Sequence, residues 1–329
     1  MKIVYKPLVK PLLATAFAAL AVLGLAGPAQ AAWPEKPIRI VVPSSPGGSA
    51  DAVARMLGDR LSRTLGQPVL VDNKGGGGGN IATDAVAKAA ADGYTLLLTG
   101  NNHSVNVSLF NPAPYALSDF APVAELTRGP SVFVAANNAP YDTLGQLIAA
   151  AKAEPGTIPF GSPGIGLPSH IAFEMFAHTT GIKMIHAPYR GSGPSLSDAI
   201  GGQIPIVTAT LAAAMPHIKA GKLKALAVTS EQRWPSLPDT PTVAETIGKP
   251  FQHLTWLGVL APQGTPAEVV TRLNTEINTV LQDPGIRETL ATLGTNPVGG
   301  SSAAFDSMIE EEAKMAATLI QNTGIKAGK

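Results

Sequence analysis

The stretch IRIVVPSSPGGSAD, residues 38–51, places a strand, a turn and a helix start next to one another. The run Ile38–Val42 is apolar and mostly β-branched, which predicts a buried strand. The prolines and glycines after it end that strand, and Ser49 stands where an N-cap residue would begin a helix. Apolar residues then recur at helical spacing from Val53 to Leu65. A strand, a Gly-rich turn and an amphipathic helix in this order predict the first unit of a parallel α/β sheet.

The same alternation continues outward from this unit. Short apolar runs predict further strands, and amphipathic segments between them predict helices. The other predicted strands are Val69–Val71, Tyr94–Thr99, Phe120–Leu126, Ser131–Ala135, Ile158–Gly161, Lys183–His186, Ile204–Thr208, Lys224–Val228 and Trp256–Leu260. The other predicted helices cover residues 81–91, 144–151, 169–180, 195–200, 212–219, 266–281, 285–293 and 302–322. Because strands and helices alternate along the chain, the predicted fold class is α/β.

The pattern predicts two domains, the second inserted into the first. Phe120–Leu126 and Trp256–Leu260 are extended segments at which the chain can cross between them. We expect domain 1 to be discontinuous, with residues 32–126 and 254–329, and domain 2 to consist of residues 127–253. The periodicity permits this insertion without establishing it. Two lobes joined by two crossings can close on a ligand by a hinge motion.

Residues 1–31 predict a secretory signal peptide. Three lysines precede the uncharged apolar run Leu12–Gly27, which is shorter than the ~20 residues of a membrane span. Ala29 and Ala31 then complete an A-x-A cleavage pattern. We therefore expect the mature protein to begin at Ala32 or Trp33 and to reside in the periplasm. An uncleaved membrane anchor is the alternative interpretation.

The composition argues against several kinds of site. The chain has no cysteine, which excludes disulfides and Cys-based metal or nucleophile sites. Basic and acidic residues are nearly balanced, 24 against 23, and no basic run is interleaved with aromatic residues, so we expect no nucleic-acid partner. Neither G-x-S-x-G nor H-E-x-x-H occurs, and a helical pair such as His170 and Glu174 is more often a local hydrogen bond than a metal site. We expect no catalytic residue, no metal and no cofactor.

Three Gly-rich segments stand where predicted strands lead into predicted helices: Pro43–Asp51, Asn73–Asn80 and Gly161–His170. Open α/β sheets bind ligands at such strand ends, and a helix N-terminus presents free N–H groups and the positive end of its dipole. Each segment can therefore receive an anion. The alternative for any one of them is a tight turn that needs a positive φ. The five-glycine run lacks the Gly-Lys-[Ser/Thr] ending of a P-loop, which makes a nucleotide site the weaker interpretation.

With these loops in place, the chain resembles the Bug (TctC-like) family, the extracytoplasmic solute receptors of the tripartite tricarboxylate transporter system. The similarity covers essentially the whole chain after residue 32. Its motifs are WPxKPI at 33–38, PGGxxD at 46–51, GGNI at 78–81, DGYTLL at 92–97, DFxPV at 119–123, GSPGIG at 161–166, SH at 169–170, APYRG at 187–191, LPDTPTV at 237–243 and APxGTP at 261–266. Each motif alone is an ordinary turn, but their order and spacing are specific.

The resemblance implies a two-lobed periplasmic-binding-protein (Venus-flytrap) architecture, each lobe a mostly parallel sheet flanked by helices. In such receptors a ligand carboxylate is held by backbone N–H groups, small hydroxyl side chains and ordered waters. The resemblance assigns a first-domain wall to Pro46, Gly47, Gly48, Ser49, Asp51, Gly78, Gly79, Asn80, Asn101 and His103. It assigns the facing wall to Ser162, Gly164, Gly166, Ser169, Tyr189, Gly191 and Ser195. The chain departs from the family at 208–212, where small residues replace a frequent aromatic-acidic pair and leave the identity of the ligand open.

The expected function is therefore that of a monomeric periplasmic receptor. It would capture a small organic carboxylate and deliver it to integral-membrane transporter subunits, without acting as an enzyme. Two alternatives remain: a ligand sensor for a membrane-bound signalling kinase, and an unrecognised hydrolase. Genes for transporter subunits or for a sensor kinase nearby would separate the first two, and turnover of a bound acid would favour the third.

Overall fold

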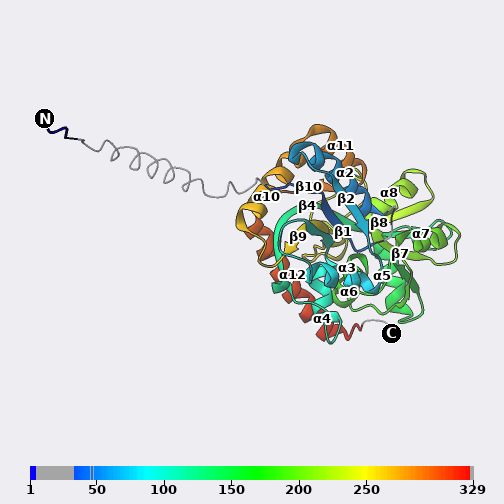
Figure 1. The fold of residues 1–329 in the computed structure, drawn as a ribbon. Helices are drawn as coiled ribbons and strands as arrows, with labels where there is room; N and C mark the ends of the chain where they lie inside the picture. Colours follow the sequence, from blue (N-terminus) through cyan, green and yellow to red (C-terminus); the bar gives the residue numbers. More distant parts are fainter. Residues whose placement is uncertain (5–32, 45, 47, 327–329) are drawn as a thin grey trace. The chain divides into compact units, whose positions relative to one another are not determined.

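Strand β4 (Phe120–Ala136) connects the two parts of the sheet in a computed structural model that describes residues 1–4, 33–44, 46 and 48–326 (Figure 1). From Phe120 to Pro130 it pairs antiparallel with β9 (Leu254–Pro262). From Ser131 to Ala136 it pairs instead with β7 and β8. The pairing partners therefore change between two consecutive residues of one uninterrupted strand.

The described strands form one sheet in the order β2-β1-β3-β9-β4-β7-β5-β6, with β8 and β10 also paired to β4. The remaining strands are β1 (Ile38–Val42), β2 (Val69–Asn73), β3 (Thr95–Gly100), β5 (Pro159–Ser162), β6 (Ile185–Pro188), β7 (Ile206–Thr210), β8 (Leu223–Val228) and β10 (Asn296–Pro297). Strands separated by helical crossovers, such as β1 and β2 or β5 and β6, are parallel. Every antiparallel pair in the described sheet involves β4 or β9. The predicted α/β class is confirmed.

The helices alternate with these strands along the chain (Figure 1). They are α2 (Ser49–Leu65), α3 (Asn80–Ala87), α4 (Asn102–Leu109), α5 (Leu144–Ala153), α6 (Pro168–Thr180), α7 (Ser192–Ile200), α8 (Leu211–Lys219), α9 (Val243–Ile247), α10 (Ala267–Gln282), α11 (Pro284–Thr292) and α12 (Ser302–Thr323), with short 3₁₀ turns η1 (Gly77–Gly79) and η2 (Leu117–Asp119). Among the described residues, no helix combines the length with the apolarity that a bilayer crossing requires.

The structure differs from the sequence predictions at several elements. The segments predicted separately at Phe120–Leu126 and Ser131–Ala135 belong to the single strand β4. Helices α4 and α9 and strand β10 were not predicted, because α4 is rich in Asn and Ser and the other two are very short. Ser49 is the first residue of α2 and not its N-cap; Gly48 is the N-cap and supplies no side-chain bond. The predicted signal peptide lies largely at residues 5–32, outside the described part of the chain, as does Gly47.

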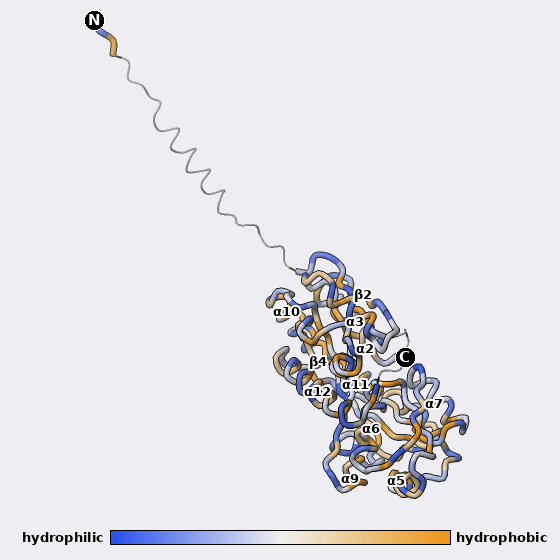
Figure 2. The backbone as a smooth tube through the Cα atoms, turned by 90° about the horizontal axis from the view of Figure 1, so that it is seen from below, coloured by the Kyte–Doolittle hydropathy of each residue, from blue (hydrophilic) through white to orange (hydrophobic). Residues whose placement is uncertain are grey.

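Buried apolar side chains cover both faces of the second part of the sheet. Phe133 and Ile206 join one cluster with Phe160 and Phe173, whereas Val134 belongs to the other. This division follows from the alternation of side chains along a strand. A further cluster fills the first part of the sheet around Val41, Leu97 and Trp256. Figure 2 shows α5, α6, α7 and α9 gathered at one end of the sheet and α2, α3, α10 and α12 toward the other.

A small cluster links helices that belong to different parts of the sheet. Val105 and Leu109 of α4 contact Ile171 of α6 and Ala316 of α12. Because α6 begins within the predicted anion-binding segment Gly161–His170, this cluster brings α4 next to that segment.

Gly258 in β9 offers a test of the packing. A Cβ atom at this position would overlap the ring of Phe305, which is buried and packs edge-on against Trp256 at 5.3 Å. We expect Gly258→Ala to lower the free energy of unfolding by about 1–3 kcal/mol, the usual range for overpacking. Urea denaturation measures this value.

Gly145→Ala is the matched control. Its Cβ would meet only Thr143 Oγ1 at 3.9 Å on an exposed helix face. Alanine there should be neutral or stabilise the protein by up to about 1 kcal/mol, since glycine is a poor helix former. Equal effects of the two substitutions would contradict the packing described at Gly258.

Candidate ligand-binding site

The loop after β1 leads into a helix start that is free of side-chain caps. The N-cap of α2, Gly48, has an extended backbone with φ −82° and ψ 170° and no side-chain hydrogen bond. Pro46 and Ser49 are exposed beside it. Since the first N–H groups of a helix have no acceptor within the helix, this end can receive an anion.

Asp51, in the first turn of α2, is buried and engaged within the protein. Its Oδ1 lies 3.0 Å from an Arg55 guanidinium nitrogen, and that guanidinium also donates to Asn73 Oδ1 at 3.1 Å. The Asn73 amide donates in turn to the carbonyl of Ser44 at 3.3 Å. These hydrogen bonds therefore tie the loop between β1 and α2 to α2 itself and to the end of β2.

The five-glycine loop is held by two asparagines of α4. The carbonyl of Gly78 accepts hydrogen bonds from the side-chain amides of Asn106, at 3.0 Å, and Asn102, at 3.3 Å. Asn106 also donates to Asn80 Oδ1 at 2.8 Å. The structure thus brings Gly78 and Asn80 together with two residues that the sequence analysis did not select. Gly79 has no room for a side chain, because a Cβ would stand 2.5 Å from the Asn102 amide nitrogen.

Asn101 ties three elements together through its side chain. Its amide nitrogen donates to the Leu254 carbonyl at 3.0 Å and to the Glu312 carboxylate, and its oxygen accepts the Trp256 backbone N–H at 3.0 Å. Glu312 also accepts from the Ser104 hydroxyl and, at 2.8 Å, from the Trp256 indole. Burial raises the pKa of Glu312, and these hydrogen bonds oppose the rise. The carboxylate therefore joins α12, α4 and β9.

His103 lies in the core. Its side chain is 1% exposed, stacks on Tyr115 at 5.2 Å and meets Phe120 edge-on at 4.8 Å. Nδ1 has no hydrogen-bond partner among the described residues. Burial accordingly lowers the pKa of His103 from 6.5 to about 3, because the charged ring would be poorly solvated.

At the end of β5, Ser162 is buried and bonded to a histidine. Its Oγ lies 2.7 Å from His186 Nε2 and accepts the backbone N–H of Gly164 at 3.2 Å. Burial, and then the neighbouring His170, lower the pKa of His186 to about 4, although Glu174 opposes this shift. The imidazole is therefore neutral at neutral pH.

A second histidine, His170 in the first turn of α6, bonds to the same loop. The backbone N–H of Gly166 donates to His170 Nδ1 at 3.1 Å, and His170 Nε2 lies 3.5 Å from a Glu174 carboxylate oxygen. The rings of His170 and His186 stack at 4.0 Å. The sequence analysis named the His170–Glu174 pair as a local contact, but it did not connect the two histidines.

Ser169 is buried where α6 meets β4 and β7. Its hydroxyl accepts from the Ser131 hydroxyl at 3.0 Å, and its carbonyl accepts from Thr208 at 2.9 Å. Ser131 in turn exchanges hydrogen bonds with Thr229. Ser169 therefore connects α6 to the residue at which β4 changes partners.

Tyr189, Gly191 and Ser195 lie around the start of α7. The Tyr189 and Gly191 N–H groups donate to the carbonyls of Ser162 and Pro163 at 3.0 and 2.7 Å, which brings the ends of β5 and β6 together. The Tyr189 hydroxyl donates to Asp198 at 2.8 Å, and the buried Ser195 hydroxyl donates to the Ser192 carbonyl at 2.9 Å. Gly191 is the N-cap of α7 and offers no side-chain cap.

The helix starts divide into two groups. Helices α5, α8, α9, α11 and α12 begin with a Thr, Asp or Ser side chain that accepts an N–H of the first turn. Helices α2, α3 and α6, which begin at the three predicted Gly-rich segments, begin without such a bond, as do α4, α7 and α10. The three predicted segments thus coincide with helix starts that lack a side-chain cap, although the Asn80 N–H at the start of α3 donates to the Gly77 carbonyl.

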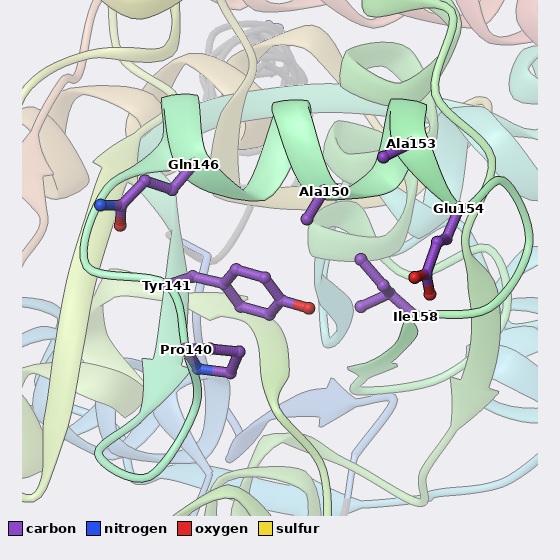
Figure 3. A pocket seen from close by; sticks show the side chains of 7 residues that line it. All are labelled: Pro140, Tyr141, Gln146, Ala150, Ala153, Glu154 and Ile158. Carbon is purple, nitrogen blue, oxygen red and sulfur yellow. The ribbon is translucent and has the colours of Figure 1, made fainter.

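A surface depression of about 350 Å³ lies elsewhere, along α5 (Figure 3). Its lining residues are Pro140, Tyr141, Gln146, Ala150, Ala153, Glu154 and Ile158. The Gln146 side-chain oxygen is already used, since it accepts the N–H groups of Asp142 and Thr143. The charged lining group is the acidic Glu154, which would repel a carboxylate. This depression does not suit an organic acid.

Nor does the described part of the chain hold a group of three or more His, Asp or Glu side chains arranged for a metal ion. Apart from Asp51, which pairs with Arg55, the polar groups of the assigned wall residues are amides, hydroxyls, backbone N–H groups and the neutral His103 ring. Such donors can bind an anion by hydrogen bonds.

The chain is similar to known proteins along most of its length. A family model described as the tripartite tricarboxylate transporter family receptor matches residues 53–325. Protein BugT of Bordetella pertussis is 39% identical over 311 residues, 93% of this chain and 95% of BugT. The structure of Rpa4515 of R. palustris with adipate has a TM-score of 0.84 at 33% identity and covers 90% of this chain and 100% of its own. MatC of Rhodopseudomonas palustris with bound malate has a TM-score of 0.80 at 30% identity, with 88% and 100% covered.

The buried histidine His103 predicts how stability depends on pH. The folded-state pKa of about 3 lies below the usual 6.5, so its contribution to stability is complete above pH 6.5 and is lost as the pH falls toward 3. At pH 5.5 this residue alone should cost about 1.4 kcal/mol relative to pH 7.5. His103→Phe keeps an aromatic ring against Tyr115 and Phe120 but cannot bind a proton. Urea denaturation at both pH values should therefore show a smaller loss for the variant, and equal losses would refute this assignment.

Proposed function

Because the chain belongs to the tripartite tricarboxylate transporter receptor family, we propose that it captures a small organic carboxylate and delivers it to a membrane transporter of that type. The family consists of periplasmic receptors and not of enzymes, and the protein has the two-lobed fold of periplasmic binding proteins. A serine bonded to a histidine is also found in hydrolases. Here the contact between Ser162 and His186 is consistent with a receptor, since Ser162 is fully buried and its hydroxyl is bonded within the protein.

The observation that carries the proposal is the set of uncapped helix starts. The first residues of α2 and α7, Ser49 and Ser192, follow the glycine N-caps Gly48 and Gly191. Neither N–H group has an acceptor among the described residues, and both face the ends of parallel strands, where α/β proteins bind ligands. An anion placed there would receive N–H bonds and the favourable end of the helix dipole.

Neutral donors suit a carboxylate ligand. A buried lysine or arginine would have to lose its hydration before meeting the ligand, and that desolvation cost offsets much of the attraction. Helix N–H groups carry no net charge and are already oriented. Adipate and malate, the acids bound by the two structural neighbours described above, are both small organic carboxylates. We expect this chain to bind an acid of the same class.

The proposal keeps the predicted division into residues 32–126 with 254–329 and residues 127–253. The ligand would lie between the loop that begins at Pro46 on one domain and the loops at Gly161–Ser169 and Tyr189–Gly191 on the other. Closure of the two domains would then complete the set of hydrogen bonds, and differential contact of this kind shifts a conformational equilibrium toward the closed form.

The proposal also includes export through a cleaved signal peptide. The mature chain would begin at Ala32 or Trp33, because the A-x-A pattern ends at Ala31. Intact-mass measurement of protein from the periplasmic fraction checks this directly. Full-length chains retained in the membrane would refute it.

A thermal-shift screen tests carboxylate capture. Adipate, malate and other small organic acids are compared with their amides, which keep the shape but lose the charge. At 100 times Kd a true ligand adds about 2.7 kcal/mol to stability and should raise Tm by several degrees. Equal shifts for an acid and its amide, or no shift across the panel, would count against the proposal.

Proline substitutions at the helix starts test where the acid binds. Ser49→Pro and Ser192→Pro each remove one N–H at a position that tolerates proline, and the preceding glycines have the extended ψ angles, 170° and 168°, that proline requires. A hydrogen bond to a charged group contributes about 1.5–3 kcal/mol, so affinity should fall about tenfold or more in calorimetric titration. Alanine variants at the same two positions separate the N–H from the hydroxyl.

Ala267→Pro is the control, since Ala267 is the exposed first residue of α10 and α10 also begins without a side-chain cap. This variant should bind the acid as the unmodified protein does. If all three proline variants behaved alike, the helix starts of α2 and α7 would not be the binding groups.

A further inference from the structure

Two histidines occupy polar groups of the loop between β5 and α6 that could otherwise bind a ligand. Gly164 donates its N–H to Ser162 Oγ, which His186 engages at 2.7 Å, and Gly166 donates its N–H to His170 Nδ1. The N–H groups of Gly164 and Gly166 are therefore not free for a ligand. The loop also bends back on itself, because Leu167 donates to the Gly164 carbonyl at 3.3 Å.

The hydrogen bond from Gly166 selects one tautomer of the neutral His170 ring. A ring nitrogen that accepts an N–H cannot carry a proton, so Nδ1 is bare and a neutral ring has its proton on Nε2. That Nε2 lies toward Glu174, 3.5 Å away and one helical turn further along α6. The carboxylate and the backbone N–H thus select the same tautomer from opposite sides of the ring.

The surroundings leave the ring little freedom. The His170 side chain is 3% exposed and lies between the loop and the rings of His186, at 4.0 Å, and Phe160, at 6.5 Å. On the other side of the loop, a Cβ at Gly166 would overlap Leu109 of α4. Gly166 is therefore held between an imidazole acceptor and an apolar side chain from another part of the sheet.

We infer that His170 is a positioning residue for ligand capture: its Nδ1 holds the Gly166 N–H and so fixes the loop 161–167 that leads into α6. The inference rests on the proposed function, since it concerns the same binding loops. With Gly166 bound to the imidazole, the first N–H groups of α6 and the adjoining start of α7 keep their positions when no ligand is present. A binding site that is ordered in advance does not lose affinity to the ordering of its own loop.

His186 supports the same loop from the neighbouring strand β6. It holds Ser162, and Ser162 holds Gly164, so the two histidines fix the loop at two points. The two rings stack at 4.0 Å, so the histidines are in direct contact. His170 is the more direct of the two, since it bonds to the loop backbone without an intermediate side chain.

Three variants on α6 separate positioning from general stability. His170→Ala removes the acceptor. His170→Asn places a carbonyl oxygen on Cγ, where imidazole places Nδ1, and can still accept the Gly166 N–H. His178→Ala makes the same change at an exposed histidine of the same helix.

The first measurement needs no ligand. Nitrogen-15 NMR of the apo protein should show His170 as the Nε2–H tautomer. The Gly166 amide should exchange with solvent at least about tenfold faster in His170→Ala than in the unmodified protein, because a protecting hydrogen bond is lost. In His170→Asn and His178→Ala this amide should stay protected. An Nδ1–H tautomer, or a Gly166 amide equally protected in His170→Ala, would overturn the inference.

The second measurement is the affinity for adipate and malate by calorimetric titration. His170→Ala should bind the acid that the unmodified protein binds about tenfold more weakly, whereas His170→Asn and His178→Ala should bind it within about threefold. Unchanged affinity in His170→Ala, or an equal loss in His170→Asn, would overturn the positioning role. If the unmodified protein bound no organic acid, the proposed function would fail, and the tautomer and exchange results would still decide the role of His170 in the loop.

Discussion

The hydroxyl of Thr229 supplies a hydrogen-bond acceptor to β4 at Ser131, where that strand changes from pairing with β9 to pairing with β7 and β8. Ser131 donates its backbone N–H to this hydroxyl at 2.8 Å, and the Thr229 backbone N–H returns a bond to the Ser131 carbonyl at 3.0 Å. The same hydroxyl donates to the carbonyl of His253, at 2.6 Å, just before β9 begins. A buried backbone N–H without a partner costs free energy comparable to a lost hydrogen bond. One threonine thus allows β4 to leave β9 and join β7 and β8 without a break.

The carboxylates of Glu125 and Glu312 are satisfied away from the helix starts of the candidate site, whereas buried Asp51 lies in the first turn of α2 and pairs with Arg55. Glu312 is satisfied by Asn101, Ser104 and Trp256, and Glu125 forms two bonds with Arg128. Each of these anions has its own donors, contributed by strands and by α4. Among the described residues, the Ser49 and Ser192 N–H groups at the starts of α2 and α7 have no acceptor, which leaves them available to an external one. The carboxylates of Glu125 and Glu312 thus use donors other than those proposed for the ligand.

The strands and most helices could be predicted from local patterns, since burial on a strand or a helix face leaves a periodic record in the sequence. Helix α4 could not, because its buried face carries Ser104 and Asn106 in place of apolar residues. The resemblance assigned Asn101 and His103 to a ligand wall, and in the structure Asn101 bonds to Leu254, 153 positions away, while His103 packs in the core. Their part in ligand binding stays a prediction. Contacts at such separations leave no local pattern, and for the same reason the pairing of Ser162 with His186 was not foreseen.

The continuity of β4 has a consequence for protein engineering. A gene divided between Pro130 and Ser131 would give two fragments, each ending in half of a strand that both parts of the sheet need. Each fragment would expose backbone N–H and C=O groups at its cut end, and exposed strand edges favour association. Reassembly would restore a continuous β4, paired with β9 in one half and with β7 and β8 in the other, only when the two halves meet in register. The junction is therefore a natural location for a split reporter whose reconstitution depends on strand complementation.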